Sequence, residues 1–201
     1  MNSFADYFSE SIQVLERARQ EWSEAFLTDA IDALVGALRS NRPVLVCGNG
    51  GSAADAMHIT TELVGRFLLD RQALRVICLS SDSAVLTACA NDYGFETIFA
   101  RQVEAYGESG GVLLGLSTSG TSPNIVRAFE QARSIGMKTI ALTGEGGGKL
   151  ATLADYLFAV PSRSTPLIQQ VHICLYHYLC QGIEGQFAGR AVLEQAAAPL
   201  R

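Results

Sequence analysis

Residues 117–122 form a short segment whose side chains are suited to binding an anion. The segment carries hydroxyl groups at Ser117, Thr118, Ser119 and Ser122, and it leads directly into a helix expected from Pro123 onward. Hydroxyl donors, free backbone N–H groups and the positive end of a helix dipole together suit a phosphate dianion. A turn that only caps the helix needs fewer hydroxyls. The sequence therefore predicts a phosphate site in this segment, which we call the serine loop.

A second loop of small residues, at 48–52, which we call the glycine loop, has two interpretations. Residues 48–53 read GNGGSA, which satisfies the dinucleotide-binding pattern G-x-G-x-x-A. That pattern needs an acidic residue at the end of the second strand, roughly twenty positions further on, and the nearest candidate at that strand end, Asp82, lies well beyond that distance. Dinucleotide binding is therefore only a minor alternative. Residues 144–149 (GEGGGK) do not form a phosphate-binding P-loop, because the glycine spacing is one short and Leu150 replaces the required Ser or Thr.

Two helices carry titratable side chains. His58 and Glu62 are four residues apart on the helix expected after the glycine loop, so they share a helix face. Such a pair can bind a metal, act as an acid and a base, or form a surface hydrogen bond. The last helix contains Gln169, His172 and His177. Helical spacing alone does not select among them, although Gln169 and His172 share a face most closely.

Five short apolar runs predict the strands that position these loops. The runs are continuous rather than alternating, which is typical of strands covered on both faces, and they span Val44–Cys47, Val76–Leu79, Val112–Leu116, Thr139–Leu142 and Tyr156–Val160. Two helices are expected in the first forty residues, from apolar positions repeating at three and four, and another at about Leu167–Ile183. The Ala-rich end from Phe187 onward is expected to form an extra helix or to fray.

Alternating strands and helices predict an α/β fold with a parallel sheet and right-handed crossovers. In the flavodoxin-like strand order 2-1-3-4-5, a ligand crevice lies between strands one and three, beyond their carboxyl ends. The loops after these two strands are the glycine loop and the serine loop. The sequence therefore predicts that the two loops form one site.

Composition and charge argue against several classes of partner and location. The chain has 201 residues, a formal net charge of -5 and no block of like charges, so a nucleic-acid or anionic-membrane partner is not expected. The five cysteines are odd in number and scattered, which favours buried, reduced thiols. Neither a signal peptide nor a bilayer-spanning run is recognisable. We expect a cytoplasmic protein.

Several longer motifs carry a resemblance to a known family. In order, the chain contains GNGGSAADAMHITTELVGRF, NDYGF, STSGTSPN, LTGEGGGKL and STPLIQQVHICLYH. This set resembles the phosphoheptose isomerases, which are the sedoheptulose 7-phosphate isomerases within the SIS (sugar-isomerase) domain family. The resemblance extends from the N-terminal helices to about residue 185, and the combination of motifs is highly specific.

The resemblance implies a single SIS domain with a five-stranded parallel sheet, and N-terminal and C-terminal helices used for oligomerisation. Residues 1–42 would be N-terminal helices of that domain, 43–187 the SIS domain itself and 188–201 a C-terminal tail. It implies a homotetramer with active sites at subunit interfaces, where Glu62 and His177 come together across an interface. The implied reaction converts sedoheptulose 7-phosphate to D-glycero-D-manno-heptose 7-phosphate, the first step in making heptose for surface polysaccharide.

The resemblance also implies residue roles. Glu62 and His177 are the implied catalytic pair, with Glu62 moving a proton between C1 and C2 and His177 protonating oxygen. One zinc per subunit is implied, held by His58, Glu62, Gln169 and His177. The implied substrate-binding residues are Asn49, Gly50, Gly51, Ser52, Asp92, Ser117, Thr118, Ser119, Ser122 and Gln169. Gln170 is a departure, because many members have glutamate there.

Two other functions remain as alternatives. Some SIS proteins that resemble phosphoheptose isomerases bind the bacterial replication initiator as non-enzymatic tetramers, but they lack the catalytic glutamate and histidine. Other SIS isomerases act on pentose or amino-sugar phosphates and usually carry different residues on the helix after the first loop. The presence of Glu62 and His177 favours the heptose isomerase.

Overall fold

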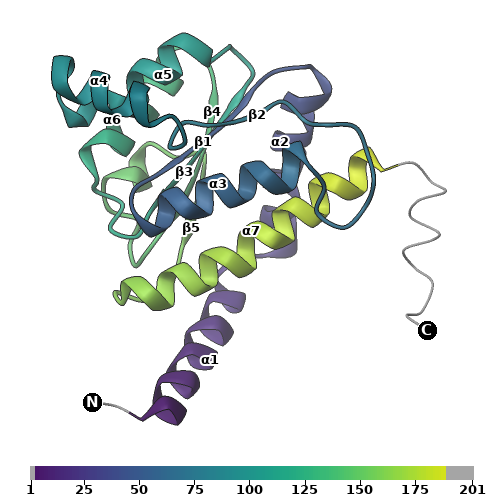
Figure 1. Ribbon diagram of the computed structural model, residues 1–201. Helices are drawn as coiled ribbons and strands as arrows, with labels where there is room; N and C mark the ends of the chain where they lie inside the picture. Colours follow the sequence, from purple (N-terminus) through teal and green to yellow (C-terminus); the bar gives the residue numbers. More distant parts are fainter. Residues whose placement is uncertain (1–2, 189–201) are drawn as a thin grey trace.

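The computed structural model describes residues 3–188 and begins with the two predicted helices, α1 (Phe4–Glu21) and α2 (Glu24–Arg39). Ser3 begins α1 with a reciprocal capping box to Asp6, and Ser23 caps α2. The second half of α1 packs on α7 (Thr165–Phe187), whereas the first half projects away from the domain (Figure 1).

The sheet has the predicted strands in the predicted order. All neighbouring strands are parallel and the order is β2-β1-β3-β4-β5. The observed bounds are within about two residues of the prediction: β1 is Val44–Gly48, β2 Val76–Cys78, β3 Val112–Ser117, β4 Lys138–Thr143 and β5 Tyr156–Ala159. The α/β fold class is therefore confirmed.

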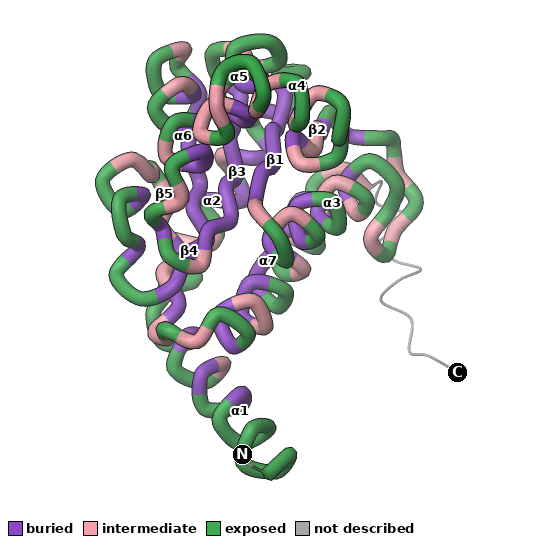
Figure 2. Tube along the Cα trace, turned by 60° about the vertical axis from the view of Figure 1, so that its left-hand side comes forward, coloured by how far each residue is buried: buried purple, intermediate pink, exposed green. Residues whose placement is uncertain are grey.

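Successive residues of the central strands supply two separate cores. Val44 and Val46 of β1 pack with α2, α3 (Gly51–Val64) and α7, whereas Leu45 and Cys47 face the opposite layer. That layer contains α4 (Ser83–Tyr93), α5 (Ile98–Tyr106) and α6 (Pro123–Ser134), with short 3-10 turns at Phe95–Thr97 and Gly148–Thr152. Figure 2 shows the buried strands between these layers. Burial on both faces explains the continuous apolar runs.

The last helix is longer than its apolar run predicted. Ser164 occupies the N-cap position and Pro166 lies in the first turn, so α7 begins before Leu167. At the other end, Ile183 and Glu184 are both buried, and the helix continues to Phe187. Residues 189–201 lie outside the described part of the chain, as does nearly all of the predicted tail at 188–201. The division of the chain into residues 1–42, 43–187 and 188–201 stays a prediction.

All five cysteines are free thiols. Cys47 and Cys180 are buried, as predicted, and Cys78 and Cys89 are partly buried. Cys174 is exposed, which corrects the expectation for that residue, because it lies on the outer side of α7. Within residues 3–188, none of the helices has the length and apolar character needed to cross a membrane.

The packing of β3 against α6 yields a stability prediction. A Cβ atom added at Gly115 would lie 2.3 Å from Cε2 of the fully buried Phe129, so Gly115→Ala should destabilise the protein by about 1–3 kcal/mol through overpacking. Gly36→Ala is the matched control, because it adds a methyl group in α2 with no atom within 4 Å and should be neutral or stabilising. Denaturant midpoints measure both. Equal midpoints for Gly115→Ala and the unchanged protein would contradict this packing.

Candidate active site

The serine loop connects β3 to α6 and holds its hydroxyl groups close together. Ser117, at the end of β3, is buried, and its Oγ lies 3.0 Å from Oγ of Ser122. Ser122 stands at the N-cap of α6, as predicted, but its side chain makes no capping hydrogen bond. Ser119 is exposed, and its hydroxyl accepts a hydrogen bond from the backbone N–H of Thr121 at 3.2 Å. The hydroxyl of Ser122 therefore pairs with Ser117 in the loop and is not used to cap the helix.

Residues 144–148 support the serine loop from behind. Gly120 has a φ of 62°, and a Cβ atom there would lie 2.0 Å from the carbonyl oxygen of Gly147. The carbonyl of Thr118 accepts a hydrogen bond from the Gly144 N–H at 3.0 Å. This glycine-rich segment is thus a packing partner of the serine loop, in agreement with the rejection of a P-loop at these residues.

The glycine loop lies beside the serine loop, as the strand order predicts. The side-chain amides of Asn49 and Asn124 exchange two hydrogen bonds, of 2.9 and 2.8 Å, which tie the end of β1 to the start of α6. Ser52 is buried in the first turn of α3. A Cβ atom at Gly51 would lie 2.5 Å from Nε2 of Gln169, so Gly51 is where α7 approaches α3. Asn124 was not among the predicted site residues, although it falls inside the STSGTSPN motif.

The acidic residues near these loops have separate roles. The carboxylate of Asp82 caps α4, because its Oδ1 accepts hydrogen bonds from the N–H groups of Ala84 and Val85. Asp92 is exposed in the last turn of α4 and accepts a hydrogen bond from Asn91 at 2.8 Å. Among the described residues, no hydrogen bond or ion pair connects Asp92 to either loop, and its substrate contact stays a prediction.

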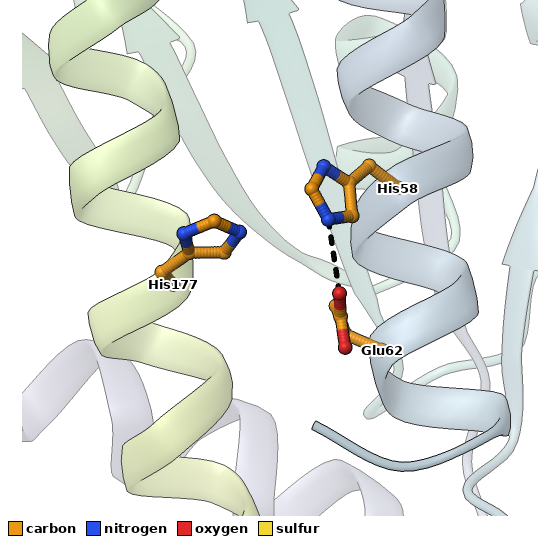
Figure 3. Close-up of side chains that lie close together, drawn as sticks. All are labelled: His58, Glu62 and His177. Atoms are coloured by element: carbon orange, nitrogen blue, oxygen red, sulfur yellow. Dashed lines mark hydrogen bonds and ion pairs between the residues drawn. The ribbon is translucent and has the colours of Figure 1, made fainter. Parts of the chain in front are cut away.

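A second group of functional side chains lies further along α3 and α7. His58, Glu62 and His177 each offer a ligand atom, and these atoms lie within 4.8 Å of one another. Nε2 of His58 is 2.9 Å from Oε1 of Glu62, and the His177 ring approaches from the facing helix (Figure 3). We call these three residues the acid/base cluster. The His58–Glu62 pair was left open by spacing, and the approach of His177 makes it part of a potential metal site.

A buried hydrogen-bond chain orients His58. The hydroxyl of Tyr176 lies 2.9 Å from Nδ1 of His58 and 3.4 Å from Oδ1 of Asp55. Burial raises the pKa of both Asp55 and Tyr176, so the tyrosine keeps its proton near neutral pH. With Nδ1 occupied, Nε2 faces Glu62 and the centre of the cluster. Sequence reasoning missed Tyr176 and Asp55, because their roles arise from the packing of α3 on α7.

The electrostatics of the cluster suit a cation. Burial, and then the neighbouring His58, lower the pKa of His177 despite the opposing effect of Glu62. His177 is therefore a neutral imidazole near pH 7, the form that binds metals. Two imidazoles and a carboxylate, with one imidazole held by a second hydrogen bond, are a ligand set that zinc accepts. The residues present fit a zinc ion.

His172 has a structural role instead. It is fully buried, and Nε2 lies 3.1 Å from the carbonyl oxygen of Thr143 at the end of β4. Burial lowers its pKa to about 4. It therefore anchors α7 to the sheet as a neutral side chain, while His177 lies in the cluster as the resemblance implied.

The structure places Glu62, His177 and Gln169 differently from the arrangement that the resemblance implied. Glu62 and His177 do not need a subunit interface to meet, because α3 and α7 of one chain bring them together. Gln169, by contrast, lies beside Gly51, and about 12 Å of helix axis separates it from His177. Within one chain, Gln169 therefore belongs with the two loops and not with the acid/base cluster.

The chain thus presents two separate groups of candidate site residues at different positions along α3, which we call half-sites. One half-site contains the serine loop, the glycine loop and Gln169, at the start of α3. The acid/base cluster is the other: His58 lies about 10 Å from Gly51 along the helix axis and Glu62 about 16 Å from it. A seven-carbon sugar phosphate stretched from C1 to phosphorus spans about 10 Å, taking about 1.2 Å per bond of an extended chain.

Comparisons with known proteins agree with this architecture. Residues 6–144 match the family model described as SIS domain. A phosphoheptose isomerase from Helicobacter pylori (strain P12) is 47% identical over 88% of this chain and 91% of its own length. One from Bordetella avium is 49% identical over 91% of this chain and 94% of its own. The solved phosphoheptose isomerase from Neisseria gonorrhoeae superposes with a TM-score of 0.84 at 40% identity, covering 90% of this chain and 96% of that one. The chain belongs to the phosphoheptose isomerase family of SIS-domain proteins.

Proposed function

We propose that this protein is an aldose–ketose isomerase that converts sedoheptulose 7-phosphate to D-glycero-D-manno-heptose 7-phosphate. The observation that carries the proposal is the pairing of a hydroxyl-rich loop at a helix N-terminus with a cluster of two histidines and a glutamate. The first suits a phosphate dianion, and the second supplies an acid and a base. The similar proteins from Helicobacter pylori and Bordetella avium are named phosphoheptose isomerases, which supports this reaction.

The residues of the cluster match the chemistry of ketose–aldose exchange. Glu62 is the proposed base that moves a proton between C1 and C2, and one of its two oxygens already faces His58 at 2.9 Å. His177 is the proposed acid that moves a proton between the two oxygens. Its lowered pKa makes it a neutral imidazole at pH 7, so it would first accept a proton from one substrate oxygen and then return it to the other.

We propose that one zinc ion per subunit binds at His58, Glu62 and His177, and that its bonds to Glu62 and His177 loosen when these residues act as base and acid. Bound zinc would polarise the carbonyl oxygen of the substrate. Gln169, the fourth ligand implied by the resemblance, lies with the other half-site of its own chain. It can join a cluster only if a neighbouring copy supplies it.

The separation of the half-sites supports an active site shared between chains. Within one chain, the distance along α3 from Gly51 to Glu62 exceeds the stretched length of the substrate. A second copy that places its acid/base cluster against the serine loop of the first would remove this gap. The proposed binding residues Asn49, Gly50, Gly51, Ser52, Asp92 and Gln169 would then hold the sugar hydroxyls, and the serine loop would hold the phosphate.

Exposed apolar residues support assembly into a homotetramer. Phe4 is 79% exposed and Phe8 56% exposed on the free half of α1 (Figure 2). On α7, Ile173 and Tyr178 are also exposed. A contiguous apolar surface of this kind marks a protein interface, and association with other copies would cover it. The cytoplasm, where the sugar-phosphate substrate occurs, is the proposed location.

The function is tested by incubating the purified protein with sedoheptulose 7-phosphate and following the aldose by NMR. We expect the aldose to accumulate, and we expect Glu62→Gln to abolish its formation because the amide cannot accept the carbon-bound proton. A replication-initiator adaptor would leave the ketose unchanged. Turnover of a pentose or amino-sugar phosphate in preference to the heptose would instead identify another SIS isomerase.

Mixing inactive variants tests the shared site. Ser119→Asp places a negative charge in the exposed serine loop and should block phosphate binding, while His177→Ala removes the acid. After subunit exchange, the mixture of these two should regain activity, since some sites would combine two intact halves. The control mixture of Glu62→Gln with His177→Ala should stay inactive, because both changes lie in the same half-site of one chain. Recovery in the control, or none in the first mixture, would contradict this arrangement.

Metal removal provides another prediction. Elemental analysis of protein purified without chelators should find about one zinc per subunit, and EDTA should abolish activity until zinc is restored. The metal should be lost as the pH falls below roughly 6, because free imidazoles protonate near pH 6.5; the lowered pKa of His177 shifts its own protonation to still lower pH. His58→Ala should weaken zinc binding and leave phosphate binding unchanged. Full activity in EDTA, with no zinc found, would remove the metal from the mechanism.

A further inference from the structure

The segment that follows α3 is irregular, yet a buried carboxylate holds its backbone. Residues 65–75 connect α3 to β2 without regular secondary structure. Glu184 of α7, with only 1% of its side chain exposed, accepts hydrogen bonds from the N–H groups of Phe67, Leu68 and Leu69 at 2.8, 2.7 and 2.9 Å. Three backbone donors on one buried carboxylate fix this short stretch to α7.

Arg71 also holds this segment, through an ion pair with Glu184 and hydrogen bonds to backbone carbonyls. Its side chain is 1% exposed, and its Nε lies 3.7 Å from Oε1 of Glu184. The guanidinium donates hydrogen bonds to the carbonyl oxygens of Glu62, Gly65 and Gln72 at 2.6, 2.8 and 3.0 Å. Arg71 therefore holds the C-terminal turn of α3, which contains Glu62, against the same segment that Glu184 holds.

The segment contacts the acid/base cluster through Phe67. The Phe67 ring lies on the His177 ring, with centroids 5.4 Å apart and an interplanar angle of 36°. Glu184 and His177 are seven residues apart on α7, so they share a face of that helix. Glu184 and Arg71 thus hold the cluster from two sides. Glu184 binds the backbone of Phe67, whose ring lies against His177, and Arg71 binds the backbone carbonyl of Glu62.

We propose that Glu184, with Arg71, is a positioning residue that sets the geometry of the acid/base cluster. A buried ion pair is a costly way to gain stability, since well-packed apolar residues of similar volume often serve as well or better. Apolar side chains, however, cannot bind three N–H groups and three carbonyls in fixed positions. The pair holds Phe67 against His177 and holds the turn of Glu62. This inference rests on the proposed function of the cluster.

The test compares Glu184→Gln with the unchanged protein by NMR of the imidazole C–H signals in the metal-free state. The chain has three histidines, so His58→Ala and His177→Ala assign the spectrum. Phe67 should shift the His177 signals through its ring current. An amide at position 184 offers one acceptor oxygen in place of two, so in Glu184→Gln the His177 signals should move toward those of a free histidine. The His172 signals should stay unchanged, because that ring is anchored at Thr143.

Zinc titration measures the consequence for the cluster. Against a chromophoric chelator, Glu184→Gln should raise the zinc Kd at least tenfold and lower kcat, while its Kd for inorganic phosphate stays within twofold. Glu108→Gln is the matched control, because it also removes a carboxylate paired with arginines, Arg42 and Arg75, and should change neither the histidine signals nor the zinc Kd. Phe67→Leu leaves the buried pair intact and should reproduce the His177 shift if Glu184→Gln does not fold.

The outcomes separate this inference from the proposed function. His177 signals that are unchanged in folded Glu184→Gln would overturn the positioning role, and so would an unchanged zinc Kd in that variant. Loss of thermal stability with unchanged signals would mean a purely structural ion pair and would also overturn it. Failure of the unchanged protein to bind zinc or to isomerise the sugar would refute the proposed function, and the NMR comparison would still decide the position of His177.

Discussion

The side-by-side packing of α3 and α7 is the contact on which the candidate site depends. At the start of α3, Gly51 leaves room for the Gln169 side chain. At its middle, the Tyr176 hydroxyl bonds His58, and His177 faces Glu62. At its end, Glu184 binds the backbone that follows α3. A shift between the two helices would alter all three sets of contacts together. This one interface therefore couples the two loops at the carboxyl edge of the sheet to the acid/base cluster.

The same packing is the reason for proposing an active site shared between chains. Because α3 starts at the carboxyl edge of the sheet and runs away from it, the phosphate half-site and the acid/base cluster of one chain are held apart by the length of the helix. Rigid helices do not close such a gap, whereas a second copy can. If the proposed shared site is right, catalysis, metal binding and assembly are linked properties of this protein.

Much of the architecture could be predicted from the sequence, because the central strands are covered on both faces and therefore have continuous apolar runs. The positions of the serine and glycine loops followed from the strand order. The C-terminal end of α7 could not be predicted, since Glu184 is polar yet buried, whereas Ser164 and Pro166 do mark the beginning of the helix. Helical spacing also could not choose between His172 and His177, because only the packed structure shows that one contacts Thr143 and the other Glu62. Asp55, Asn124, Tyr176 and Glu184 were missed for the same reason: each acts through a residue distant in sequence.

The most direct test of the shared-site account is a crystal structure of the assembled protein with sedoheptulose 7-phosphate bound to an inactive Glu62→Gln variant. The account predicts the phosphate on Ser119 and Ser122 of one copy, with C1 and C2 of the same molecule beside residue 62 and His177 of another copy. A substrate held at both ends by a single chain, or a phosphate bound away from the serine loop, would contradict it.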